Sequence, residues 1–368
     1  MTVTKKTVWA NWFNKDLTDD LETVAMRILV TGGLGFIGSH AAEFFANNGH
    51  DVVVFDNQSR SKLLGAKPAN PNYVRKQLGR HKNIQIINGD IRRYRALAGA
   101  VQQVDAILHT AGQVAVTTSI SDPRTDFEIN ALGTFNLLEF ARKSDARVIF
   151  TSTNKVYGHN VNSIPVLDEG TRYAFRGKKY SHGIAEDFPI DNTSHSPYGC
   201  SKLAADTYVQ DYAETYGMQT GVFRMSCIYG DRQFGVEDQG WVAWFAIAAL
   251  LDRVITIYGD GKQVRDVLYI SDLVRAFDLF LKSTEKHAVF NIGGGPENTM
   301  SLVELLVLLE RMTGKAPKIK HSEWRVADQK VYVSNINKVS KALGWSPTVA
   351  PEQGLQKLVE WWKRYLQA

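Results

Sequence analysis

The segment from Tyr198 to Lys202 reads YGCSK and sets a tyrosine and a lysine four positions apart. On a helix this spacing puts the phenol and the ammonium on one face, about one turn apart. A free tyrosine has a pKa of about 10, which is too high for a base at neutral pH. A nearby ammonium lowers that pKa, so Tyr198 could exchange a proton with a substrate hydroxyl. Such pairs also arise by chance on helices, so the pattern needs support elsewhere.

A second polar segment, TSTNKVYG at residues 151–158, directly follows a predicted strand. Residues that follow the strands of a parallel sheet gather at its carboxyl edge, where ligands of such folds bind. Thr153 could hydrogen-bond the reacting oxygen there and orient it toward Tyr198. The two segments together predict a catalytic centre of Thr153, Tyr198 and Lys202.

A glycine-rich run connects the first predicted strand to the first predicted helix and contains Gly32, Gly35 and Gly38, with Phe36 and Ile37 between the last two. Glycine lets the backbone turn tightly and approach a pyrophosphate with no Cβ in the way. A plain tight turn would also use glycine. The place of this run between a strand and a helix predicts a dinucleotide site.

Asp56 ends the second predicted strand, about 20 residues after the glycine run. A carboxylate there would accept hydrogen bonds from the adenosine ribose and repel a 2′-phosphate, which favours NAD over NADP. Arg60 could stack on adenine or accept a phosphate, and Asp90 is a weaker candidate for the adenine amine. The other predicted cofactor contacts, besides Tyr198 and Lys202, are Asn57, Ser59, Ile91, Ala111, Gln113, Asn130 and Ser152.

Short β-branched runs alternate with amphipathic helical patterns through the first 230 residues. The predicted strands are residues 27–31, 51–56, 84–88, 106–109, 147–151 and 220–224, and the helices between them include 37–48, 126–143 and 198–216. This alternation predicts an α/β fold with a doubly wound parallel sheet. We divide the chain into an accessory segment (1–25), an NAD-binding domain with the catalytic residues (26–230) and a smaller, mainly substrate-binding lobe (231–368) interleaved with the end of the sheet.

Composition excludes several classes of protein. The net charge of +5 is mild, and the sequence lacks the basic stripe with interleaved aromatics that would indicate nucleic-acid binding. No apolar run reaches the roughly 18 residues of a membrane span. The two cysteines and the histidines lack metal-ligand spacing, and two cysteines cannot form a disulfide framework. We therefore expect no metal and a reducing cytoplasm.

The glycine run, Asp56, the Thr153 segment and the Tyr198/Lys202 pair together resemble an extended short-chain dehydrogenase/reductase of the NAD-dependent epimerase/dehydratase family. The resemblance covers roughly residues 26–366. More specific strings resemble the branch that inverts C2 of CDP-linked sugars: AGQVAVTTS at 111–119, DFEIN at 126–130, STNKVYG at 152–158, HSPYGCSK at 195–202, DQGW at 238–241 and GKQVRDV at 261–267.

The resemblance implies a tightly held NAD that is reduced and reoxidised within one turnover. Hydride would leave sugar C2 while Tyr198 takes the hydroxyl proton, and it would return to the other face of a 2-keto intermediate. A dehydratase or decarboxylase of this family would need carboxyl groups beside Thr153, where this chain carries Asn154 and Lys155. Two alternatives stay open: a UDP-sugar 4-epimerase of the same fold, and a non-catalytic NAD-binding protein.

The resemblance also implies a substrate site for a nucleotide-diphosphate sugar. Arg265, Arg325 and Asp328 match the family's positions for the diphosphate and the nucleotide ribose, and Arg232 is a third candidate cation. Trp241 would form a pocket wall. Gln113, Thr117 and Thr118 follow a predicted strand at the crevice and could contact the sugar. The helices at 126–143 and 198–216 are those that related proteins pair across a dimer, which implies a homo-oligomer.

Overall fold

The computed structural model describes residues 25–60, 71–325 and 328–367. Nearly all of the predicted accessory segment, residues 1–24, lies outside the described residues.

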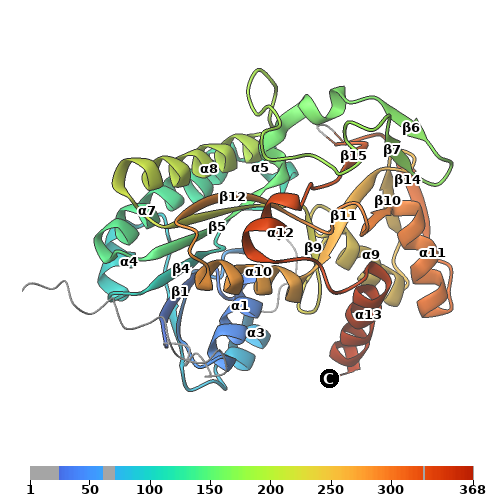
Figure 1. Ribbon diagram of the computed structural model, residues 1–368. Coiled ribbons are helices and arrows are strands. Elements are labelled where there is room, and N and C mark those ends of the chain that lie inside the picture. The colour runs from blue at the N-terminus through green and yellow to red at the C-terminus, as the bar shows by residue number, and fades with distance from the viewer. Residues whose placement is uncertain (1–24, 61–70, 326–327, 368) are drawn as a thin grey trace, which may run out of the picture.

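Seven parallel strands form the central sheet, in the order β12-β8-β5-β4-β1-β2-β3 (Figure 1). Their bounds are β1 Arg27–Thr31, β2 Asp51–Asp56, β3 Ile84–Asn88, β4 Ala106–His109, β5 Arg147–Thr153, β8 Thr220–Met225 and β12 His287–Ile292. This sheet confirms the predicted doubly wound α/β architecture. All six predicted strands are present, and β12, which was not among them, adds a seventh from far along the chain.

Both faces of this sheet are buried. Ile28 and Val30 of β1 face one core cluster, and Leu29 between them faces another, because successive side chains of a strand point to opposite sides. One face carries α1 (Phe36–Asn47), α3 (Pro71–Leu78) and α10 (Ile270–Lys282). The other carries α4 (Tyr94–Ala100), α7 (Gly133–Ser144) and α8 (Pro197–Tyr216) (Figure 1). Because helices cover both faces of the sheet, the carboxyl edge of its strands is the place where a ligand can bind.

The predicted helix over 126–143 is present as an unbroken run of helical residues with a π-helical turn inside it. It begins earlier, at α6 (Pro123–Phe127), passes through a π-helical turn η1 (Glu128–Leu132) and continues as α7. Asp122 caps α6 by accepting from Thr125 N, and Pro123 takes the first helical position, where its missing N–H costs nothing. The π-helical turn carries Asn130 into the core. Such turns concentrate at functional sites.

The region after β8 adds a smaller lobe. Its four-stranded sheet contains β9 Cys227–Tyr229, β11 Val264–Tyr269, β13 Thr299–Ser301 and β15 Val331–Tyr332, and β10 Ile255–Tyr258 pairs with β14 Ile319–Ser322. Its helices are α9 Trp241–Leu250, α11 Leu302–Thr313, α12 Asn337–Leu343 and α13 Pro351–Gln367, and a hairpin of β6 Val166–Asp168 and β7 Tyr173–Phe175 lies beside them.

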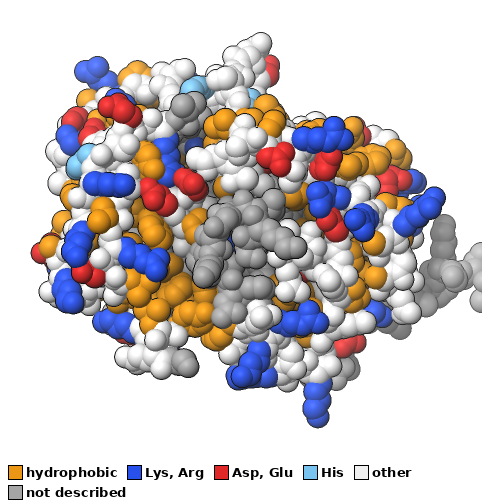
Figure 2. Space-filling view, turned by 180° about the vertical axis from the view of Figure 1, so that it is seen from behind, with side chains coloured by type: hydrophobic (Ala, Val, Ile, Leu, Met, Phe, Trp, Pro, Cys, Tyr) orange, Lys and Arg blue, Asp and Glu red, His pale blue; other side chains and the backbone are white. Residues whose placement is uncertain are grey.

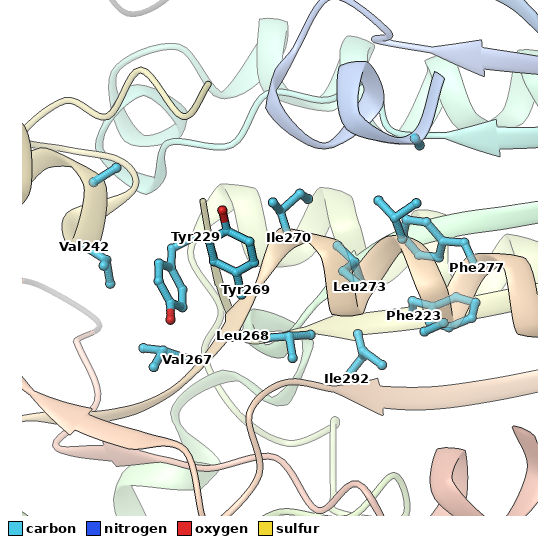
Figure 3. Close-up of a cluster of buried hydrophobic side chains, with 14 of the residues drawn as sticks. Phe223, Tyr229, Val242, Val267, Leu268, Tyr269, Ile270, Leu273, Phe277 and Ile292 are labelled. Carbon is cyan, nitrogen blue, oxygen red and sulfur yellow. The ribbon is translucent and has the colours of Figure 1, made fainter. Parts of the chain in front are cut away.

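A continuous apolar core joins this lobe to the sheet. Phe223 of β8 and Phe277 of α10 lie in the same cluster as Tyr229, Leu268 and Tyr269 of the lobe (Figure 3). This shared core holds the smaller lobe against the central sheet. Figure 2 shows one face of the molecule, on which Lys and Arg side chains lie scattered among Asp and Glu. No helix among the described residues is long and apolar enough to cross a membrane.

A buried histidine links β4 to its neighbours and makes stability depend on pH. His109 Nδ1 lies 2.7 Å from the Thr31 hydroxyl oxygen, and Nε2 lies 3.0 Å from that of Thr134. Burial, with the nearby Lys202 charge, lowers its pKa to about 3. The unfolded chain keeps a value of about 6.5 and binds the extra proton, so stability is lost as pH falls from 6.5 toward 3. The wild-type free energy of unfolding should therefore fall by about 1.4 kcal/mol per pH unit because of His109, and His109→Gln should lose this part of the pH dependence.

Urea denaturation between pH 6.5 and 5 measures that slope. His182→Gln, at an exposed position, is the matched control and should leave the slope unchanged. Equal slopes for His109→Gln and the wild type would contradict the assignment of His109 as a neutral buried group.

Candidate active site

Two glycines, Gly32 in the turn between β1 and α1 and Gly38 in the first turn of α1, have no room for a side chain. Gly32 adopts a left-handed conformation with φ of 68°, and its N–H donates to Phe55 O at 2.8 Å. A Cβ on Gly32 would lie 2.7 Å from the Ala111 backbone, and one on Gly38 would lie 2.4 Å from Gly32 O. The bare backbone at the N-terminus of α1 is suited to a pyrophosphate, because helix N-termini attract anions.

Replacing Gly38 with alanine should therefore expel the dinucleotide and destabilise the fold by about 1–3 kcal/mol, because backbone atoms cannot yield as a side chain can. Gly99→Ala is the matched control. Gly99 lies in α4 with open space around it, and alanine there should stabilise the helix by about 0.5–1 kcal/mol. Thermal unfolding and the A260/A280 ratio of the purified proteins report both effects. Retained cofactor in Gly38→Ala would contradict this role for the turn.

Thirteen of the predicted cofactor contacts line one pocket. They are Gly32, Gly35, Phe36, Ile37, Gly38, Asp56, Asn57, Ser59, Arg60, Asp90, Ile91, Ala111 and Gln113. Asp56 accepts from Leu34 N at 2.9 Å and Gln58 N at 2.7 Å, and burial raises its pKa. Two backbone donors thus fix this carboxylate at the end of β2, facing the pocket.

Two charged residues of this pocket are already engaged. The Arg60 guanidinium donates to Phe234 O and to Gln239 Oε1, and burial lowers its pKa to about 10. Asp90 pairs with Arg92 at 2.7 Å; burial acts to raise its pKa, but the hydrogen bonds from Arg92 leave it lowered. Arg60 therefore connects the cofactor pocket to the segment before α9.

The catalytic candidates meet where β5 ends. Helix α8 begins with Pro197, and Ser196 Oγ caps it by accepting from Gly199 N. This start places Tyr198 in the first turn, buried, with its backbone N donating to Ser119 Oγ at 3.1 Å. The Thr153 side chain, at the end of β5, lies close enough to the Tyr198 hydroxyl to lower the tyrosine pKa by hydrogen bonding. The structure thus brings together two residues that are 45 positions apart in the chain.

The effect of Lys202 on Tyr198 differs from the prediction. Burial raises the pKa of Tyr198 to about 12, and the hydrogen bond with Thr153 only partly opposes this. Lys202 Nζ donates to Thr151 O at 2.6 Å and lies 4.1 Å from the centre of the Phe150 ring. Burial lowers its own pKa to about 7, whereas the carboxylates of Asp206 and Asp126 raise it. The expected lowering of the tyrosine pKa is absent because the ammonium turns to a backbone carbonyl.

A buried polar network lies behind the pair. Asp126 accepts from Gln113 Nε2 at 2.9 Å, from Asn130 Nδ2 at 3.1 Å and from Ser201 Oγ. Ser152 Oγ donates to Asp206 at 2.6 Å. Internal hydrogen bonds therefore occupy the polar side chains of Gln113, Asn130 and Ser152. Asn130 and Ser152 also do not line the cofactor pocket.

Sequence reasoning missed three residues of this centre: Ser119, Asp126 and Asp206. Asp206 stands four positions after Lys202 on α8, so the helical spacing could have indicated it. Ser119 and Asp126 lie within the family-like strings at 111–119 and 126–130, but their contacts depend on how α5 (Val116–Ser121) and α6 pack against α8.

The predicted substrate residues fall into separate places. Arg265 of β11 pairs with Asp328 at 2.6 Å. Arg325 pairs with Asp238 at 3.0 Å and stacks over the Tyr258 ring at 4.0 Å. Arg232 instead pairs with Glu43 of α1 at 2.7 Å. Arg232 lines the cofactor pocket, and Arg265 does not line it.

Trp241 opens α9, and its indole N–H donates to Cys227 Sγ at 3.3 Å. Cys227 lies close enough to Arg265 and Lys155 for their charges to affect its pKa, which burial raises. Trp241 and Arg265 are thus brought near one another. Thr117 and Thr118 lie on α5, the first exposed and the second partly so, and neither lines the cofactor pocket.

Comparison with known proteins gives this arrangement a family. The model of the NAD dependent epimerase/dehydratase family matches residues 28–293. The chain belongs to this family. It is 42% identical over 348 residues to CDP-paratose 2-epimerase from Salmonella typhi, covering 91% of this chain and 99% of that protein.

Solved structures of family members share its fold. UDP-glucose 4-epimerase from Thermotoga maritima, with UDP-glucose, is 30% identical with a TM-score of 0.76, covering 93% of this chain and 100% of that one. UDP-glucose 4-epimerase from Thermus thermophilus, solved with NAD, is 30% identical with a TM-score of 0.73, covering 92% and 99%. This epimerase/dehydratase is accordingly NAD-dependent, and its bare glycine turn and the Asp56 carboxylate fit a dinucleotide with free ribose hydroxyls.

Proposed function

We propose that the protein inverts C2 of a CDP-linked hexose, in the manner of CDP-paratose to CDP-tyvelose, through a transient 2-keto sugar. The observation that carries this proposal is the 42% identity to CDP-paratose 2-epimerase over nearly the full length of both chains. The side chains beside Thr153 support it, because Asn154 and Lys155 supply no carboxyl group for dehydration.

In this proposal Thr153 and Tyr198 hold the C2 oxygen between them, and Tyr198 takes its proton. The glycine turn and Asp56 would hold NAD, which would supply the hydride chemistry at C2. In this proposal the Lys202 ammonium, whose charged form the Asp206 and Asp126 carboxylates favour, turns from Thr151 O toward the tyrosinate and stabilises it when substrate is bound. Residues 231–368 contribute most of the substrate contacts, with Arg265, Arg325 and Asp328 on the diphosphate and the nucleotide ribose and Trp241 as a wall.

NMR of the purified protein with CDP-paratose and, separately, CDP-glucose tests the reaction without added NAD. Inversion at C2 would establish the reaction and the resident cofactor together, and it would rank the two sugars. Turnover of neither, combined with inversion at C4 of a UDP-hexose, would overturn the proposal in favour of a UDP-sugar 4-epimerase.

We also propose that the protein works as a cytoplasmic homo-oligomer. Its two cysteines are free thiols, which suits a reducing compartment. Large apolar side chains on the segment from α6 to α7 and on α8 are exposed: Phe127 (56%), Leu132, Phe135, Tyr208 (46%) and Tyr216. Because α7 and α8 pack side by side, these side chains suit a self-complementary helical interface.

Light scattering during gel filtration measures the oligomer. Phe127→Glu with Phe135→Glu should convert it to monomers, whereas Val307→Glu, on the equally exposed face of α11, should not. A wild type that elutes as a monomer would contradict this part of the proposal.

A further inference from the structure

Lys155 lies two residues beyond Thr153, where β5 ends and the 3-10 segment η2 (Asn154–Ser163) begins. Its backbone N–H donates to the Thr153 hydroxyl oxygen at 3.2 Å, which ties the start of its side chain to the catalytic centre. Among the described residues, no hydrogen bond or ion pair reaches its ammonium. None of the roles assigned above uses this cation.

Three groups of the C-terminal lobe lie close enough to the ammonium for their charges to affect its pKa. They are the Arg265 guanidinium, the Asp328 carboxylate and the Cys227 thiol. Burial, followed by the positive charge of Arg265, lowers the pKa of Lys155 to about 8. Asp328 is already bound to Arg265 at 2.6 Å, so it cannot neutralise both cations. Lys155, Arg265 and Asp328 together carry one positive charge in excess, with Lys155 partly and Arg265 almost fully buried, and an anion would compensate it.

The chemistry of a nucleotide sugar identifies that anion. The phosphate is attached through oxygen to C1, so it lies next to C2 and across the ring from C4. When the C2 oxygen is held by Thr153 and Tyr198, the phosphate must therefore lie beside the catalytic threonine. When C4 is held there, the phosphate lies a ring width away. A lysine whose backbone is held two residues from Thr153 is placed to meet the phosphate in the first arrangement and not in the second.

We propose that the Lys155 ammonium binds the sugar-side phosphate of the substrate and thereby presents C2, rather than C4, to Thr153 and Tyr198. This inference rests on the proposed function. It makes Lys155 a specificity-determining residue that connects the catalytic centre on β5 to the cation of Arg265 on β11. Lys155→Arg should keep most of the function, because it keeps the charge.

Binding of CDP and CMP to the NAD-loaded protein, measured by calorimetry, isolates this contact, since CMP lacks the second phosphate. We expect Lys155→Met to weaken CDP binding about tenfold or more and to leave CMP binding unchanged. Its kcat/KM for inversion of CDP-glucose at C2 should fall at least as far. Lys286→Met, at an exposed position before β12, is the control and should match the wild type in every assay.

The outcomes separate this inference from the proposed function. A wild type that inverts no CDP-hexose would refute the proposed function, and the inference with it. An active wild type together with a Lys155→Met variant that binds CDP normally would refute the phosphate contact alone. Equal losses of CDP and CMP affinity would also refute it, because they would indicate a disturbed fold rather than a lost phosphate ligand.

Discussion

Tyr198→Phe should lower turnover of CDP-glucose by about 10²–10⁴-fold while the protein keeps its NAD. The substitution removes only the hydroxyl, whose proton transfer the reaction requires and whose partner is Thr153. The ring stays in place because Tyr198 is buried and α8 is fixed at its start by the Ser196 cap. Initial rates and the cofactor content of the purified variant measure the two quantities separately.

Tyr208→Phe is the matched control for this experiment. It removes a hydroxyl from the same helix, at a position that is 46% exposed, and should retain full activity. Full activity in Tyr198→Phe would contradict the catalytic assignment. Loss of NAD from Tyr198→Phe would show that the phenol serves binding rather than proton transfer.

The sheet was predictable because its strands are buried on both faces. Continuous β-branched runs such as residues 51–56 carry that signal locally, and six of the seven strands follow from it. The seventh strand, β12, joins the sheet by pairing with β8, some 60 residues earlier in the chain. No local sequence pattern predicts that pairing. The π-helical turn at Asn130 was not predicted either, and the Asn130 side chain there donates to Ser201, which is 71 positions away in the chain.

The candidate site shows the same limit at the level of single side chains. The glycine turn and Asp56 follow from backbone geometry that a short motif encodes. Which way a buried hydroxyl or ammonium points depends on partners far along the chain. Ser152 points to Asp206 and Lys202 to Thr151 O, so neither direction could be predicted from spacing.

A buried ion pair beneath the catalytic helix gives the second large effect. Arg224 of β8 donates to both carboxylate oxygens of Asp206 on α8 at 3.0 Å, and the two side chains are 4% and 0% exposed. Arg224→Met would leave the Asp206 charge buried and uncompensated. We expect it to cost about 3–5 kcal/mol of unfolding free energy in urea denaturation. Arg311→Met, which breaks an exposed pair with Glu352, is the control and should cost no more than about 1 kcal/mol.

The same substitution reaches the active site, because the Asp206 carboxylate raises the pKa of Lys202. Without the Arg224 charge to offset it, Asp206 should stabilise the Lys202 ammonium further and raise that pKa above its value of about 7. The alkaline fall of kcat/KM, where Lys202 loses its proton, should then move to higher pH. A destabilised variant with an unchanged pH profile would show that the pair serves the fold alone. A shifted profile would show that Arg224 and Asp206 set the charge on which the tyrosine depends.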